Sequence, residues 1–571
     1  MTTTPSLPRQ LWQMGQGAAA SLISLEREAT AEFAVLVLAL GCLLYPVICN
    51  SMPPLLDYAG HISRVYILHE LIHGSGFADM YGYRMAVIPN LAVDGIVLGL
   101  MELGVSVEIA GRCFLALSLI LIATGVVALH YATFRRFSVW PVLALPFVYN
   151  QIFAWGFINF QFGVGLALCS AALWRLTECR RLAISGATLL ACSVALFFSH
   201  LLTLLLMLGI VIGQGLCDLV WPSRSRAEHA RRLMLAVVAG GLPLALLFFS
   251  PLVADNAPPT LAAALQQLSL AALRARFEGL LSVAWGYDNQ LDLASILCVA
   301  AVTTYGLITG ILVRDVRMLL PIAGLLVIYL LVPDGWFGTA MLPDRLPIVI
   351  ALLAAAATDV TPMRRWQRAA LPGIIAILSV LRGAAVEQAW STANTAFQPL
   401  LAAFKTIPEG SRIYTAFAYK GDYSNRIYMP YLYWALPAYA AIYRHAFTIH
   451  TFASLSQSLV YPQPAFEAAP PDPHNYRVDR PRKVAAETPY APALLAFYDY
   501  ALVINPAYWP IEPPANVLPV LSGPHYTLFR IGKDERVVLG PCQDRVFPGG
   551  RQFHVWPACC SLIPRTAGGS S

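Results

Sequence analysis

The chain has 571 residues, of which 57% are hydrophobic and only 12% are charged, and its mean hydropathy is +0.61. Soluble domains carry about 25% charged residues, so this composition excludes an ordinary soluble enzyme and predicts an α-helical polytopic membrane protein. The net charge of +6 gives no support for nucleic-acid binding, because the sequence has no basic stripe with interleaved aromatic residues.

About eleven apolar segments are long enough, or nearly long enough, to be transmembrane helices. They are predicted at residues 32–50, 108–131, 138–153, 161–175, 182–199, 201–220, 233–250, 292–312, 318–332, 346–360 and 369–386. No small-residue cleavage site follows the first segment, so we expect it to be retained as a span.

Arginines occur in every second loop between these segments. They are Arg135, Arg136, Arg175, Arg180, Arg181, Arg224, Arg226, Arg231, Arg232, Arg314, Arg317, Arg364, Arg365 and Arg368. By the positive-inside rule these loops and the N-terminal segment 1–31 are cytoplasmic. The outer loops 51–107 and 251–291, and the chain after residue 387, then lie on the periplasmic face of a bacterial inner membrane. The transmembrane domain is predicted to cover residues 32–386.

Two stretches of the outer loops are predicted to be helices that lie in the membrane interface. Residues 91–103 are apolar but about one helical turn too short to cross the bilayer comfortably. Residues 259–284 alternate apolar residues with polar ones. For both stretches the alternative is an ordinary loop with a helix that only packs, and for residues 259–284 this alternative is a fair one.

Residues 387–571 differ in character, with more proline and shorter apolar runs, and they predict an outer α/β domain. Its elements are predicted as strands at 412–419, 498–504 and 526–531, a helix at 431–444 and an irregular loop at 462–482. In an oxidising periplasm, a disulfide from Cys542 to either Cys559 or Cys560 is expected.

Asp57 lies where the chain first leaves the membrane. If a helix starts after the proline pair 53–54, then Asp57, His61 and Arg64 share one face at i, i+4 and i+7. An ionisable cluster at the membrane edge is a functional candidate, and the alternative is a solvated loop at the lipid headgroups. A carboxylate that takes a proton from a hydroxyl near neutral pH benefits from a raised pKa, which desolvation supplies and a neighbouring cation opposes.

Other residues on the outer side could contact a phosphate or a sugar. Arg64, Arg84 and Arg345 offer guanidinium forks suited to phosphate oxygens, although headgroup binding or pairing with a nearby acid, such as Asp344 for Arg345, is the alternative. His200, at a turn between two spans, is a pocket candidate or a buried hydrogen-bonded histidine.

A divalent metal is conceivable but is not the main expectation. Asp57 and His61 could share a metal ion, and His69 and His73 recur further along at near-helical spacing. Histidines at an interface are more often polar anchors, so no metal or other cofactor is predicted.

The chain resembles a known family in the order of its parts. The order is a first span, an outer loop with an acid directly after that span, interfacial helices, an entry to the second span from Gly104 to Arg112, and an extracytoplasmic C-terminal domain. This order resembles the GT-C superfamily of integral-membrane glycosyltransferases. The run Asp57, His61, Arg64 is similar to one in bacterial membrane proteins, while the Asp-Asp and Glu-x-x-Tyr forms of several GT-C members are absent.

The resemblance implies a function on the periplasmic face. The donor would be a sugar on a polyprenyl phosphate and the acceptor a hydroxyl of a lipid or glycan. Asp57 would be the general base, and the substrate-binding residues would be His61, Arg64, Arg84, His200 and Arg345. The alternative is a non-catalytic membrane subunit that binds lipid or polysaccharide or scaffolds partner proteins. A transporter is disfavoured, because the sequence has no clear inverted repeat and few charges within spans.

Overall fold

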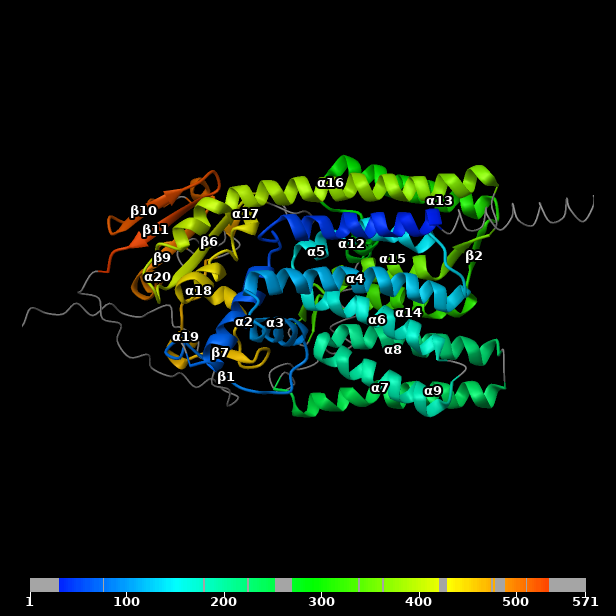
Figure 1. Cartoon of the computed structure of the whole chain (residues 1–571). Helices are drawn as coiled ribbons and strands as arrows, with labels where there is room; N and C mark the ends of the chain where they lie inside the picture. Colours follow the sequence, from blue (N-terminus) through cyan, green and yellow to red (C-terminus); the bar gives the residue numbers. More distant parts are fainter. Residues whose placement is uncertain are drawn as a thin grey trace, which may run out of the picture.

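The structure is a computed structural model in which long helices run side by side and a mixed α/β domain caps one end of the bundle (Figure 1). The residues that it describes are 30–74, 76–177, 180–222, 225–251, 270–336, 339–361, 364–420, 429–473, 476–477, 488–509 and 511–533. The N-terminal segment 1–29 and the predicted disulfide of Cys542 lie outside this part of the chain. We call the end of the bundle that bears the α/β domain the domain end.

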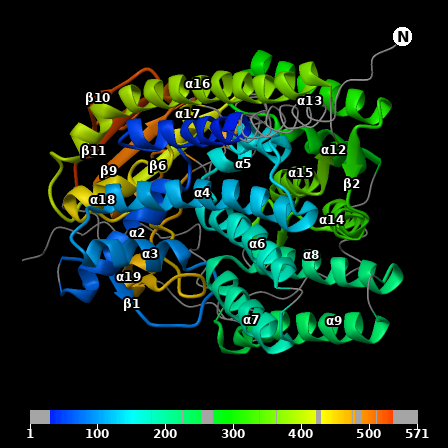
Figure 2. The same cartoon turned by 45° about the vertical axis from the view of Figure 1, so that its right-hand side comes forward.

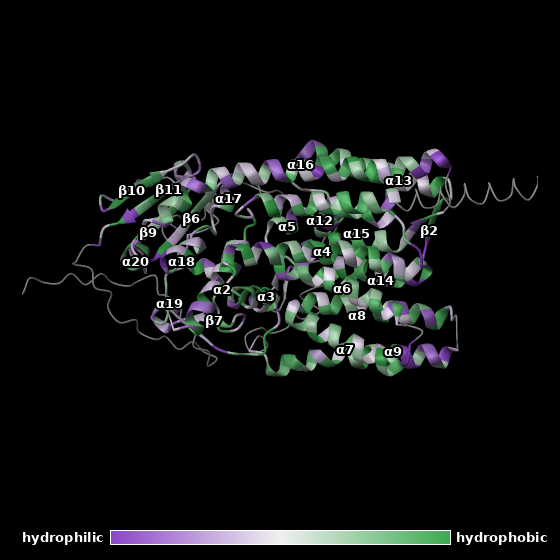
Figure 3. Ribbon diagram, viewed as in Figure 1, coloured by the Kyte–Doolittle hydropathy of each residue, from purple (hydrophilic) through white to green (hydrophobic). Residues whose placement is uncertain are grey.

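Within the described residues, seven helices are long and apolar enough to cross a membrane, and each matches a predicted span. They are Thr30–Cys49, α4 (Val107–Phe134), α7 (Leu182–Ser199), α8 (Leu201–Val220), Arg226–Phe249, which joins α9 (Arg226–Gly241) to the 3-10 helix Leu242–Phe249, α13 (Asn289–Ile308) and α16 (Arg365–Phe404). Hydrophobic residues line their central parts and polar residues gather towards their ends (Figure 3). The fold is therefore that of a polytopic α-helical membrane protein, as predicted.

Four predicted spans differ from regular spanning helices. They correspond to a 3-10 helix (Trp140–Phe147) followed by α5 (Gln151–Ala154), to α6 (Ile158–Leu176), to α14 (Leu319–Leu331) and to α15 (Leu346–Ala356). In the first, Pro141 and Pro146 remove the amide hydrogens that an α-helix needs. The 11 residues of α15 rise only about 17 Å, against an apolar bilayer core of about 30 Å. α14 has only 13 residues, whereas α6 has 19 and is mostly buried. The length of an apolar segment alone does not show these differences.

The predicted arginine loops meet at the end of the bundle opposite the α/β domain. There, Arg136 donates to Asp359 at 2.5 Å and Arg175 to Asp315 at 3.0 Å. Both acids lie in or beside the short sheet of β2 (Leu312–Arg314) and β5 (Thr358–Val360), far from the domain end (Figure 1). The positions of the arginines in the sequence therefore predict correctly which loops lie at the end opposite the α/β domain.

A five-stranded sheet forms the centre of the α/β domain, with the order β10-β11-β9-β6-β8. Its strands are β6 (Ile413–Tyr419), β8 (Tyr476–Arg477), β9 (Tyr500–Ile504), β10 (Val517–Ser522) and β11 (Tyr526–Ile531). β6 pairs in parallel with β8 and β9, while β11 is antiparallel to β9 and β10. The three predicted strands are thus confirmed, and β6 and β9 are buried along their length.

The predicted helix at 431–444 is wrong in extent. The structure has two short helices, α17 (Met429–Leu432) and α18 (Ala438–Arg444), because Pro437 starts a new helix instead of continuing the old one. The predicted loop at 462–482 contains a turn of helix, α19 (Pro464–Glu467), and the short strand β8.

The first outer loop belongs physically to the α/β domain. It forms α2 (Tyr58–Ile72), β1 (Tyr81–Tyr83) and α3 (Ala92–Glu102), and β1 pairs antiparallel with β7 (Val460–Pro462). α16 runs without a break from the opposite end of the bundle into the domain (Figure 1). The predicted domain boundary at 386/387 falls inside this helix, so the bundle and the domain share one continuous element.

The predicted interfacial helix at 91–103 is confirmed as a helix, α3, which packs against α2 and α4. Of the second predicted stretch, 259–284, the structure describes α12 (Leu270–Leu280) and a 3-10 turn (Leu281–Val283).

Candidate functional site

Asp57 stands directly before the first residue of α2, at the domain end of the bundle. The helix begins after the proline pair, as the sequence predicts. The backbone N–H of Asp57 donates to the carbonyl of Trp155 at 3.0 Å. Gly156 lies against the same amide with φ at +81°, and a Cβ there would be 2.7 Å from the Asp57 nitrogen. Only glycine allows the turn between α5 and α6 to approach the backbone of Asp57 so closely. This contact holds Asp57 against the turn.

The carboxylate of Asp57 is partly buried and has no salt bridge or side-chain hydrogen bond within the described part of the chain. Desolvation raises the pKa of Asp57 to about 7, and the positive charge of Arg345 lowers this pKa by a smaller amount. The pKa of Asp57 is therefore well above the usual range of an aspartate, because burial disfavours its charged form.

Arg64 and His61 also lie near Asp57, but neither lowers its raised pKa. Arg64 is buried and forms a bidentate ion pair with Asp94 of α3, at 2.9 Å from Nε to Oδ1 and 2.7 Å from Nη2 to Oδ2. Burial, followed by the charges of Arg64 and Arg345, lowers the pKa of His61 well below its usual value. His61 is thus neutral, and its Nδ1 is buried without a hydrogen-bond partner in the described structure.

Breaking the pair of Arg64 and Asp94 is expected to be costly. The substitution Asp94→Asn leaves a buried guanidinium without its counter-charge, which destabilises proteins by about 3–5 kcal/mol. We expect a clear fall in the Tm of the purified protein in detergent. The double variant Arg64→Met, Asp94→Leu removes both charges together and should recover much of the loss; a stable Asp94→Asn variant would contradict a structural role for the pair.

Arg345 is the cation that faces the same region as Asp57. Its Nε and Nη2 donate to the carbonyl of Ala340 at 3.2 and 3.0 Å, and its guanidinium lies 3.6 Å from the ring centroid of Phe157. The alternative of an ion pair with Asp344 is not observed, and Nη1 has no partner in the described structure. The aromatic stacking and the carbonyl hold Arg345 in place while one edge of its fork stays available.

His200 and Arg84 complete the list of predicted contacts. The ring of His200 packs edge-on against Phe160 at 5.5 Å, and burial lowers the pKa of His200 to about 3, with the charge of Arg345 as the second cause. Its Nδ1 accepts from the Leu202 N–H at 3.2 Å. Arg84 follows β1, and no hydrogen bond or ion pair within the described chain joins it to the other candidates.

The structure therefore brings together four of the predicted residues around Arg345, places Arg64 near His61, and leaves Arg84 apart. Asp57, His61, His200 and Arg345 are linked by the electrostatic effect of Arg345 on the other three. Arg64 also affects His61 but is paired with Asp94, and Arg84 follows β1.

Sequence reasoning missed the aromatic residues that shape this site. Phe157 and Phe160 pack on Arg345, at 3.6 and 5.5 Å from ring centroid to guanidinium. Tyr431 of the α/β domain is close enough for the Asp57 charge to contribute to its raised pKa, after desolvation. Phe157 caps α6 and Phe160 lies in its first turn. Nothing in the sequence links these residues to Arg345, or Tyr431 to Asp57.

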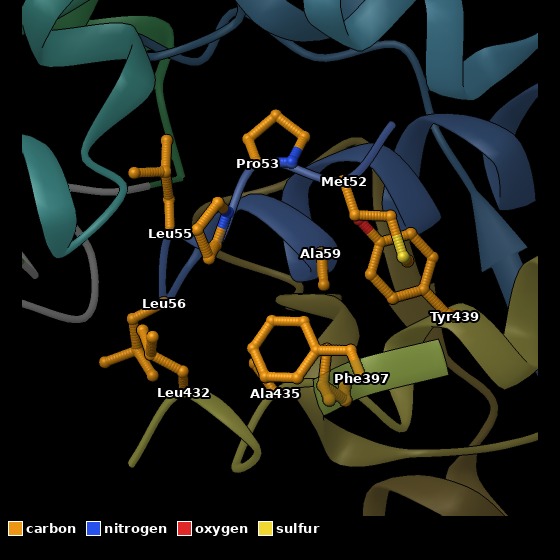
Figure 4. A pocket seen from close by; sticks show the side chains of 11 residues that line it. Met52, Pro53, Leu55, Leu56, Ala59, Phe397, Leu432, Ala435 and Tyr439 are labelled. Atoms are coloured by element: carbon orange, nitrogen blue, oxygen red, sulfur yellow. The ribbon is translucent and has the colours of Figure 1, made fainter. Parts of the chain in front are cut away.

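An apolar pocket lies between the segment of chain that precedes Asp57 and the α/β domain (Figure 4). Met52, Pro53 and Leu55 form one wall, and Phe397 and Tyr439 face them. Its volume is about 10 Å³, which is close to the space of one water molecule. A lipid or sugar therefore needs movement of side chains or of a segment before it fills this pocket.

The fold and the site together define a class: a polytopic membrane protein in which a raised-pKa acid and a stacked arginine lie between the helix bundle and an α/β domain. No family model matches the chain, and a search of curated proteins finds no match. Among solved structures, the chain is similar to ArnT from Cupriavidus metallidurans, in a crystal structure bound to undecaprenyl phosphate. The similarity covers 90% of this chain and 98% of that one, at 12% sequence identity and a TM-score of 0.45.

Proposed function

We propose that the protein is a membrane glycosyltransferase that moves a sugar from a polyprenyl-phosphate carrier to an acceptor hydroxyl on the periplasmic face. The observation that carries this proposal is the partly buried Asp57, with a pKa near 7, beside an arginine whose Nη1 is free within the described chain. An acid and a cation that are close but not paired suit a reaction in which a proton is taken at one point and a phosphate leaves at another.

The proposed reaction uses Asp57 and Arg345. The acceptor oxygen forms a bond to the anomeric carbon while Asp57 takes the hydroxyl proton. The bond from the anomeric carbon to the phosphate oxygen breaks on the opposite side, and its electron pair leaves with the polyprenyl phosphate. Arg345 stabilises the negative charge of the departing phosphate. The anomeric configuration is inverted, and Asp57 afterwards returns the proton to water.

The neutral histidines and the aromatic residues fit supporting roles. Neutral His61 has an unused Nδ1, so it can hydrogen-bond to a sugar hydroxyl without lowering the pKa of Asp57. His200 remains neutral beside Phe160. Arg64 positions α2 through Asp94 instead of binding substrate.

The reaction is expected to depend on pH through Asp57. A general base acts only when ionised, so transfer should rise as the pH increases through about 7 and level off above it. Below its pKa Asp57 is protonated and cannot accept a proton, so activity decreases as the pH falls. Initial rates measured from pH 5 to pH 9 check this; a flat profile over that range contradicts a titrating base.

The proposal is tested in cells by the glycolipids and polysaccharides that the protein modifies. Membranes that contain the wild-type chain should yield a sugar-bearing product by mass spectrometry, and membranes that contain Asp57→Asn at equal abundance should lack it. If both variants give the same products and the protein co-purifies with a partner, the non-catalytic subunit replaces the enzyme as the interpretation.

A further inference from the structure

A second group of polar side chains lies at the far end of α2 from Asp57. His69, in the last turn of α2, and His73, which caps it, are four residues apart and face the same side of the helix. Glu102 is the last residue of α3. The two helices lie side by side in both views (Figures 1 and 2), so the three side chains meet.

The ligand atoms of these side chains converge. Nε2 of His73 is 3.7 Å from one Glu102 oxygen, and Nε2 of His69 is 4.0 Å from the other. One ligand atom from each of the three residues lies within 4.8 Å of the other two. Ligands of a tetrahedral zinc ion are about 3.3 Å apart, given metal–ligand distances near 2.0–2.1 Å. Small rotations of partly exposed side chains close this difference.

Hydrogen bonds on the opposite ring nitrogens orient both imidazoles towards that point. Nδ1 of His73 donates to the carbonyl of His69 at 2.8 Å, and Nδ1 of His69 lies 3.3 Å from the Glu70 carboxylate. With Nδ1 protonated, each Nε2 presents its lone pair to the space beside Glu102. Histidines that bind metals usually donate their other N–H to a carboxylate or carbonyl in this way.

We propose that His69, His73 and Glu102 bind a divalent transition metal ion, with zinc as the best match. Two imidazole nitrogens and one carboxylate suit zinc, whereas magnesium and calcium prefer oxygen ligands throughout. The side chains are 22%, 49% and 46% exposed, so the ion has access from solvent and a water molecule completes its coordination.

The metal joins the ends of α2 and α3. The buried pair of Arg64 and Asp94 connects the same two helices nearer their other ends. Glu70, which orients His69, also lies 4.0 Å from His445 of the α/β domain. The ion therefore restrains α2, the helix that begins directly after Asp57, whether or not the protein transfers sugars.

Zinc binding is measured on the full chain, purified in detergent without a histidine tag. Equilibrium dialysis against buffered Zn²⁺ followed by metal analysis should give one zinc ion per chain. The double variant His69→Asn, His73→Asn should lose it, and Glu70→Gln should bind about 10–100-fold more weakly, because it removes a hydrogen bond that orients a ligand. His525→Asn, a partly exposed histidine outside the group, is the matched control and should bind as the wild type does.

A spectroscopic measurement needs no variant. Co²⁺ in place of zinc should give visible absorption bands of a four-coordinate site, which added Zn²⁺ abolishes and Mg²⁺ does not. Zinc should also raise the Tm of the wild type but not of the double variant. Wild-type protein that takes up no zinc at micromolar concentration, or a double variant that binds it equally well, overturns the proposal.

Discussion

Asp57→Asn is expected to lower the rate of glycosyl transfer by about 10²–10⁴-fold, the range that a positioned general base contributes. Asparagine keeps the size of the side chain but cannot accept a proton from the acceptor hydroxyl. Initial rates with membranes or with purified protein and extracted lipid-linked sugar measure the effect. A variant that retains the full rate removes Asp57 from the mechanism.

Asp344→Asn is the matched control for this substitution. Asp344 is also an acid whose pKa is raised by burial, and it is also affected by the charge of Arg345. Asp344→Asn should retain activity, whereas loss of transfer in this variant alone would assign the base to Asp344. Asp57→Asn should also be at least as stable as the wild type above pH 7, because it removes a charge that burial disfavours.

Arg345→Gln is expected to lower the rate by about 10²–10³-fold, the usual cost of losing one charged or hydrogen-bonding group that stabilises a transition state. Arg345→Lys should recover only part of this loss, since lysine keeps the charge but not the planar fork stacked on Phe157. Rates measured at saturating donor separate this effect from weaker binding.

The pH profile distinguishes a mechanistic role of Arg345 from a structural one. The charge of Arg345 lowers the pKa of Asp57, so removing it should move the rise in activity to higher pH. Arg276→Lys is the control: Arg276 also stacks on an aromatic ring, Tyr329, and bonds to a carbonyl, that of Val332. This variant should change neither the rate nor the profile.

Much of the fold follows from the local sequence. Long apolar segments and the arginines between them predict about eleven spans and the two ends of the bundle, because both signals depend only on neighbouring residues. Seven of these spans are spanning-length helices in the described part of the chain. The helices α14 and α15 are as apolar as spans but have only 13 and 11 residues. Where a helix begins and ends depends on the whole fold, so the length of an apolar segment overestimates the length of these helices.

The candidate site was predicted in part for a similar reason. Asp57 and His61 lie close together in the chain, and their helical spacing placed them on one face. Arg345 comes to them from a distant loop and packs on Phe157 and Phe160 at the start of α6. The sequence does not identify the partner of Arg64, because Asp94 lies in the predicted interfacial helix at 91–103, whose packing on α2 is evident only in the structure.

The lipid that remains bound to purified protein tests the central claim most directly. If Asp57 takes the proton that starts transfer, then Asp57→Asn should retain a polyprenyl phosphate that still carries its sugar, while the wild type, purified from the same cells, should carry the polyprenyl phosphate without it. Mass spectrometry of the extracted lipids reads out both. Equal amounts of the sugar-bearing lipid on the two proteins, or no polyprenyl lipid on either, would contradict the account.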